Sequence, residues 1–106
     1  MRKYFNKLVR DRIPEIIQAE GRTFQLETLD NGAYLAALMQ KLIEEAEELA
    51  AASPEKRKEE LADILEVLDA IVVTLDYDRV EILAEQRRRR AERGSFFERI
   101  KLLWVE

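Results

Sequence analysis

The pair Ser53-Pro54 divides a long stretch of the chain in which apolar side chains recur at helical spacing. Serine is favoured immediately before a helix, and proline fits the first helical position, where its missing N–H is not needed. We therefore expect one long helix that starts at residue 30 or 31 and ends near Ala52, and a second from Pro54 to about Leu75. Helices joined by so short a connection pack antiparallel, which predicts an all-α fold built on a helical hairpin.

Apolar side chains cover more than one side of the second helix. The first helix is expected to face it with Leu35, Leu38, Met39, Leu42, Ala46 and Leu49. The side of the second helix expected to pack on Leu42, Ala46 and Leu49 carries Leu61, Leu65, Leu68 and Val72. Further apolar positions widen this surface: Ile64, Val67, Ile71 and Val73. Because one hairpin cannot cover so wide a surface, we expect at least a dimer.

Two shorter helices are expected outside the hairpin. Asp11 is placed to cap a short helix that has Pro14 near its first turn and ends at Gly21. Asp78 is followed three residues later by a glutamate, which is the spacing of a capping box, so a third main helix is expected to start there. Gly94 is a natural stop for that helix.

A minor β-hairpin is also expected. Residues 23–29 alternate apolar and polar side chains as a strand does, and an isolated strand needs a partner to be stable. The C-terminal segment 96–104 mixes aromatic, basic and aliphatic residues and is the expected partner. No linker-like stretch interrupts the chain, so residues 1–106 are predicted to form one domain.

The two long helices carry five carboxylates close to their apolar sides: Glu44, Glu45, Glu48, Glu60 and Asp63. At about 100° per residue, residues three apart lie only ~60° apart around a helix, so each acidic pair forms one edge. Carboxylates gathered beside a half-buried seam repel one another and lose hydration, and a cation relieves both effects. Hard oxygen ligands favour Mg²⁺ or Mn²⁺.

The alternative interpretation is a solvated helix face, because acidic residues three or four positions apart usually pair with Lys or Arg. We assign Glu47, Glu59 and Glu66 to such a surface. Glu60 and Asp63 lie next to the apolar positions of the second helix instead of opposite them, which favours the metal site for the remaining carboxylates.

The composition excludes several kinds of chemistry. The chain contains neither Cys nor His, which removes disulfides, thiolate nucleophiles, Cys/His zinc sites and a histidine base. The net charge of −4 argues against general nucleic-acid binding, although the run Arg87–Arg90 is basic; the alternative for that run is a solvated helix face. No apolar run is long enough for a membrane span and the N-terminus lacks a signal peptide, so we expect a cytoplasmic protein.

Three segments together resemble the MazG-like all-α nucleotide pyrophosphohydrolases. The acidic elements are Glu44-Glu45-x-x-Glu48 and Glu60-x-x-Asp63. The opening stretch NKLVRDRIPEII, residues 6–17, is similar to the start of a small house-cleaning branch, and Arg93-Gly94-Ser95-Phe96 with Arg99-Ile100 is similar to its end. One departure is Ser95-Phe96-Phe97, where that branch has a second Gly before a single Phe.

The resemblance implies a four-helix bundle formed by the hairpins of two chains. It also implies hydrolysis of a nucleoside triphosphate between the α and β phosphates, giving a monophosphate and pyrophosphate and clearing noncanonical nucleotides. The Mg²⁺ ligands would be Glu45, Glu48, Glu60 and Asp63. Glu44 would be a further catalytic group: a base for the attacking water, a partner of a ligand, or a ligand of another ion.

Phosphate groups also need cations supplied by the protein, and three basic residues are expected to bind them: Lys41, Arg10 and Arg99. For each, the alternative is an ordinary surface salt bridge. Two other functions remain open at this point. One is a non-catalytic helical module for nucleotide sensing or protein interaction. The other is phosphoribosyl-ATP pyrophosphohydrolase, an enzyme that shares the acidic scaffold.

Overall fold

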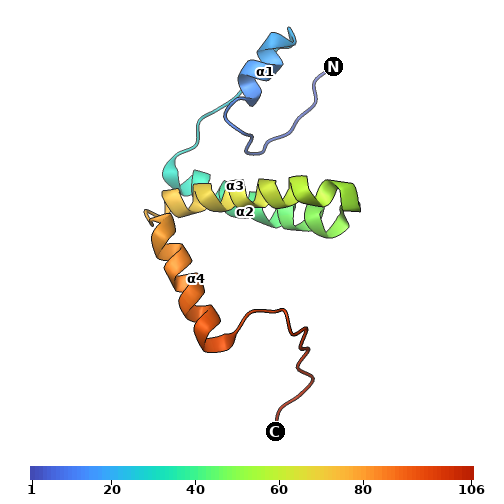
Figure 1. Cartoon of the computed structure of the whole chain (residues 1–106). Coiled ribbons are helices and arrows are strands. Elements are labelled where there is room, and N and C mark those ends of the chain that lie inside the picture. Colours follow the sequence, from blue (N-terminus) through green and yellow to red (C-terminus); the bar gives the residue numbers. More distant parts are fainter.

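The computed structural model describes residues 1–106 and is all-α, as predicted. Figure 1 shows the element order, with a hairpin of two long helices at the centre of the molecule. The helices are α1 (Ile13–Ala19), α2 (Asn31–Ala51), α3 (Arg57–Thr74) and α4 (Arg79–Arg93). A short 3₁₀ turn, η1 (Pro54–Lys56), joins α2 to α3. No helix combines the length and apolar character that a bilayer crossing would require.

Side chains at the helix starts explain two of the boundaries. The Asp30 carboxylate accepts a hydrogen bond from the backbone N–H of Ala33 at 2.9 Å and caps α2. At the start of α4, the Asp78 carboxylate accepts a hydrogen bond from the backbone N–H of Val80, and the Glu81 side chain accepts one from the backbone N–H of Asp78. The predicted capping box is therefore confirmed.

Two predicted starts were wrong. The residue before α1 is Arg12, and no side chain caps this helix, so Asp11 does not cap it. Helix α3 begins at Arg57 and not at Pro54, because residues Pro54–Lys56 form the tighter 3₁₀ turn first. Ser53 precedes that turn without a side-chain capping hydrogen bond.

The core lies between α2 and α3. Leu38 from α2 and Val67 and Ile71 from α3 are its buried apolar side chains. Around them pack four partly buried residues: Leu8, Tyr34, Leu42 and Ala70. Because Leu8 comes from the segment before α1, the N-terminal part of the chain contacts the hairpin core directly.

The predicted packing face of α3 was wrong. Leu61, Leu65 and Leu68 do not face α2: they are 52%, 57% and 39% exposed. The face that contacts α2 is instead the one with Val67 and Ile71. Both faces of α3 are apolar, and helical periodicity alone does not say which of them meets the partner helix within the chain.

The remaining segments extend away from the hairpin. Helix α4 diverges from α3 after residues 75–78, and its first residue, Arg79, contacts Asp69 at 3.3 Å. The radius of gyration is 18.3 Å, whereas a compact chain of this length has about 13 Å. Only 4 of 106 residues are buried, so a single chain leaves most of its apolar surface in contact with water.

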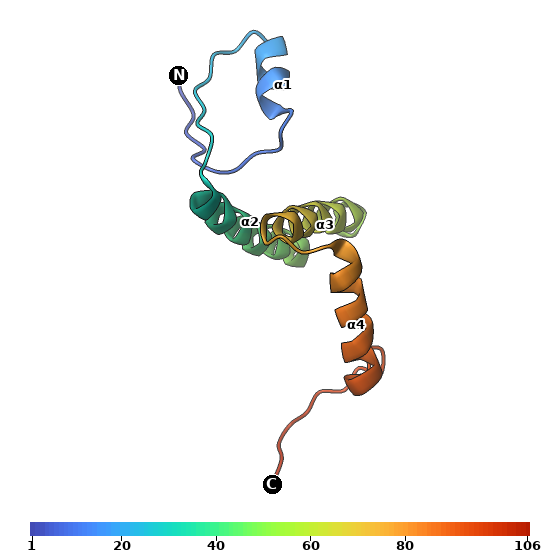
Figure 2. The same cartoon turned by 90° about the vertical axis from the view of Figure 1, so that its left-hand side faces the viewer.

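The predicted β-hairpin does not form within one chain. Residues 23–29 and 96–104 contain no strand. Figures 1 and 2 show the reason: the connection between α1 and α2 and the C-terminal segment lie on opposite sides of the hairpin, so the two cannot pair in a single molecule. The backbone N–H and C=O groups of a strand without a partner can form hydrogen bonds only with water, so such a strand is not stable alone.

Candidate metal centre

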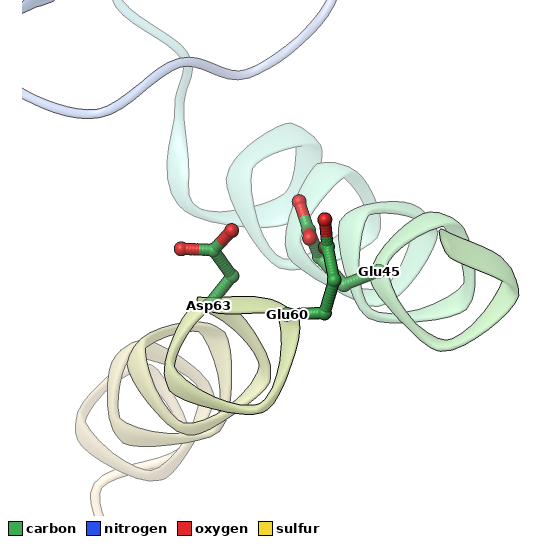
Figure 3. Close-up of side chains that lie close together, drawn as sticks. All are labelled: Glu45, Glu60 and Asp63. Atoms are coloured by element: carbon green, nitrogen blue, oxygen red, sulfur yellow. The ribbon is translucent and has the colours of Figure 1, made fainter. Parts of the chain in front are cut away.

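Three carboxylates from the two long helices converge at one point of the hairpin. Glu45 comes from α2, and Glu60 and Asp63 come from α3. One oxygen of each side chain lies within 4.8 Å of one oxygen of the other two. Figure 3 shows the three side chains pointing into the space beside the α2–α3 contact, with the N-terminal segment passing over them. We call these three residues the carboxylate cluster.

The spacing of the oxygens suits a small divalent ion. Ligand oxygens about 2.1 Å from Mg²⁺ lie roughly 3.0 Å apart when adjacent and 4.2 Å apart when opposite in an octahedron. The three oxygens lie within 4.8 Å of one another, so the side chains would have to draw closer to share one ion. Three carboxylates with waters or phosphate oxygens at the other positions would complete the shell.

Burial distinguishes this cluster from an acidic surface patch. Glu45 is only 6% exposed, and it is the one charged residue buried in the chain. Oε2 of Glu45 and Oε2 of Glu60 are both shielded from water and have no hydrogen-bond partner. A buried carboxylate oxygen without a donor is costly, so both atoms fit a cation held between the helices.

The electrostatics of the cluster agree with its geometry. Burial, the Glu48 charge and the Asp63 charge raise the pKa of Glu45 to about 6. Burial, followed by the Glu48 charge, also raises the pKa of Glu60. The charged forms of these carboxylates are therefore destabilised in the metal-free protein, and a divalent ion would reverse this effect.

Two protein cations lie at the cluster. The Lys41 ammonium is 3.8 Å from Oε1 of Glu45, one turn away on α2, which is the salt bridge given above as the alternative to phosphate binding. Nη2 of Arg10 donates a hydrogen bond of 2.6 Å to Oδ1 of Asp63 across 53 positions of sequence. Sequence reasoning identified both residues as basic candidates but not the Arg10–Asp63 contact, because no local pattern encodes it.

A small cavity lies between the N-terminal segment and α2, with Lys41, the partner of Glu45, in its lining. Its volume is about 140 Å³, and its lining residues are Asn6, Lys7, Leu8, Ala37, Gln40, Lys41 and Glu44. Asn6 has a φ of 47°, a left-handed conformation that asparagine tolerates better than most residues. Glu44 lines this cavity and is not one of the three carboxylates of the cluster. The amide groups of Asn6 and Gln40 were not among the predicted site residues, since isolated amides give no sequence signal.

Besides Glu44, two further predicted site residues are not part of the cluster. Glu48 is exposed and is not one of the three converging carboxylates, although its charge acts on both Glu45 and Glu60. Arg99 lies in the exposed segment after α4, and Figures 1 and 2 show this segment on the far side of α4 from the hairpin. A single chain therefore does not bring Arg99 to the carboxylates, because α4 leads this segment away from the hairpin.

The surface assignments of the other acidic residues are confirmed. Glu47, Glu59 and Glu66 are all exposed. Glu59 accepts a hydrogen bond from Nζ of Lys56 at 3.4 Å, which is a local pair three residues apart. The sequence pattern therefore separated these three residues correctly from the converging carboxylates.

Comparison with known proteins yields one partial similarity. A 46-residue segment of the chain is 59% identical to an uncharacterized protein of Mycolicibacterium smegmatis. The segment makes up 43% of this chain and 47% of that protein, so the match spans about half the length of each. No family model matches the chain, and no solved structure matches it. Because that protein is uncharacterized, the similarity assigns no activity to this chain. The chemistry of the carboxylate cluster is therefore inferred from its geometry.

Proposed function

We propose that the chain is a Mg²⁺-dependent nucleoside triphosphate pyrophosphohydrolase, which cleaves its substrate between the α and β phosphates. The observation that supports the metal dependence is the carboxylate cluster, with two buried oxygens that lack any donor, whereas the substrate and the bond cleaved are what the resemblance of the acidic elements and of residues 6–17 implies. Lys41 and Arg10 pair with Glu45 and Asp63, but they leave Oε2 of Glu45 and Oε2 of Glu60 without a partner, which supports a role beyond a structural salt bridge. Mn²⁺ has the same ligand preference and is expected to replace Mg²⁺.

Within this proposal, each group at the site has a distinct task. Glu45, Glu60 and Asp63 would hold a divalent ion, whose positive charge would neutralise phosphate oxygens and acidify a water. Glu44 and Glu48, on α2 near Glu45 but outside the cluster, are the candidates to orient that water or accept its proton. Lys41 and Arg10 supply charge to the phosphates that carboxylates would otherwise repel.

Turnover of a nucleotide panel tests the proposal. The full-length chain would be incubated with canonical and noncanonical nucleoside triphosphates, with Mg²⁺ or with excess EDTA, and pyrophosphate and monophosphate would be measured. We expect both products in equal amounts from at least one nucleotide, with Mg²⁺ only. Absence of metal-dependent turnover on every nucleotide would reject the enzyme and favour the non-catalytic nucleotide-sensing or protein-interaction module.

We also propose that two chains pack through the apolar stripe of α3, which consists of Leu61, Leu65, Leu68 and Val72. The stripe lies on a different side of α3 from Val67 and Ile71, which contact α2, and three of its four side chains are more than a third exposed. At about 100° per residue, Leu65 lies roughly 160° around the helix from Asp63. A second hairpin on the stripe would therefore complete a four-helix bundle and leave the carboxylate cluster accessible.

A charge in the stripe is expected to dissociate the dimer. Light scattering should give twice the chain mass for the wild type at micromolar concentration and the chain mass for Leu65→Glu, because the interface would bury an unpaired carboxylate. Glu66→Lys is the matched control: it changes the charge at the next position, off the stripe, and should remain dimeric. A monomeric wild type would contradict the proposed bundle.

A further inference from the structure

The Arg10–Asp63 contact places a cation of the N-terminal segment directly on a proposed metal ligand. Nη2 of Arg10 and Oδ1 of Asp63 are 2.6 Å apart, and the two side chains are 58% and 39% exposed. Leu8, two residues earlier, packs against the core of the hairpin. The backbone before Arg10 is thus anchored to the hairpin, while the Arg10 side chain that reaches Asp63 is more than half exposed.

The charges at the site indicate what this contact does. The three carboxylates of the cluster have two cations in contact with them, Lys41 on Glu45 and Arg10 on Asp63. A divalent ion bound to Asp63 would compete with Arg10 for the same carboxylate. It would also repel the guanidinium, because positive charges a few ångströms apart near a protein surface repel each other before screening.

We propose that Arg10 is a built-in counter-cation of the metal-free site, which a divalent ion displaces from Asp63. The proposal rests on the metal site proposed above. It assigns Arg10 two positions: on Asp63 without metal, and released from Asp63 with metal. Because Leu8 keeps the backbone in place, the released guanidinium stays near the cluster, where it is available to a metal-bound phosphate.

Metal affinity gives the test, since it needs no turnover. Mn²⁺ binding to the full-length chain would be measured by calorimetry for the wild type, Arg10→Gln, Arg10→Lys and Arg12→Gln. An exposed ion pair that must be broken on binding corresponds to about a two- to fivefold change in affinity. We expect Arg10→Gln to bind Mn²⁺ tighter than the wild type by this factor, and Arg10→Lys to lie between the two.

Arg12→Gln is the matched control. Arg12 belongs to the same segment and carries the same charge, but it pairs locally with Glu15 at 2.8 Å and does not touch the cluster. Its replacement should leave Mn²⁺ affinity unchanged, which separates the direct contact from a general loss of positive charge. Without metal, Arg10→Gln should melt below the wild type, and saturating Mn²⁺ should remove this difference.

Three outcomes would overturn the inference. Equal Mn²⁺ affinity of the wild type and Arg10→Gln would mean that Arg10 is not displaced. Weaker binding by Arg10→Gln would mean that Arg10 helps to form the site. If the wild type itself bound no Mn²⁺, the proposed metal site would fail together with this inference, whereas the first two outcomes leave the metal site intact.

Discussion

Asp63→Asn is expected to lower pyrophosphate release by at least ~100-fold, which corresponds to the ~3 kcal/mol or more typical of lost electrostatic stabilisation in an active site. The amide has the shape of the carboxylate but lacks the charge that a divalent ion requires. The measurement is the Mg²⁺-dependent release of pyrophosphate from the best nucleotide of the panel.

The folded state should tolerate this change. Asp63 loses its hydrogen-bonded ion pair with Arg10, but it also stops repelling Glu45, so the metal-free melting temperature should change little. Glu66→Gln is the control on the same helix, since Glu66 is exposed and outside the cluster. Equal loss of activity in both variants would contradict the position of the site on α3, and full activity in both would mean that the carboxylate cluster is not catalytic.

Glu45→Gln is expected to stabilise the metal-free protein. The pKa of Glu45 is raised to about 6 from 4.5, mainly by burial, so its charge opposes folding at neutral pH. A shift of this size corresponds to roughly 1–2 kcal/mol, and at about 4–8 °C per kcal/mol the melting temperature should rise on the order of 5–10 °C. Thermal unfolding in EDTA at pH 7 measures this difference.

Metal and pH provide the controls for Glu45→Gln. Millimolar Mg²⁺ should raise the melting temperature of the wild type by linkage and leave that of the variant nearly unchanged. The destabilising ionisation of Glu45 sets in as pH rises from 4.5 through about 6, so the advantage of the variant should vanish at pH 4. Glu47→Gln, an exposed position two residues along α2, should show neither effect.

Local chemistry made most of the fold predictable. The hairpin follows from helical periodicity on either side of Ser53-Pro54, and Asp30 and Asp78 mark helix starts because their carboxylates cap backbone N–H groups. The convergence of Glu60 and Asp63 follows from their three-residue spacing on α3, and the antiparallel hairpin brings Glu45 to them, whereas the same spacing on α2 does not bring Glu48 into the group. These features depend on neighbours in sequence or on one helix pair, so a pattern in the sequence encodes them.

Features that depend on distant contacts could not be predicted. Leu65 and Val67 belong to two apolar faces of α3, and only tertiary packing decides that Val67 meets α2 while Leu65 stays exposed. The pairing of Arg10 with Asp63 is likewise invisible to any local rule. Residues 23–29 have the alternation of a strand, but no segment of the same chain reaches them to form a sheet.

The Arg10–Asp63 contact also bears on the order in which the molecule assembles. It closes a loop of 53 residues, and the entropy cost of closing a loop grows with its length, whereas the α2–α3 turn brings near neighbours together. We therefore expect the hairpin to form first and the N-terminal segment to dock onto it afterwards. The carboxylates would then be assembled before the cation that neutralises Asp63 arrives, so a nascent chain would present its acidic cluster open to solvent ions during folding.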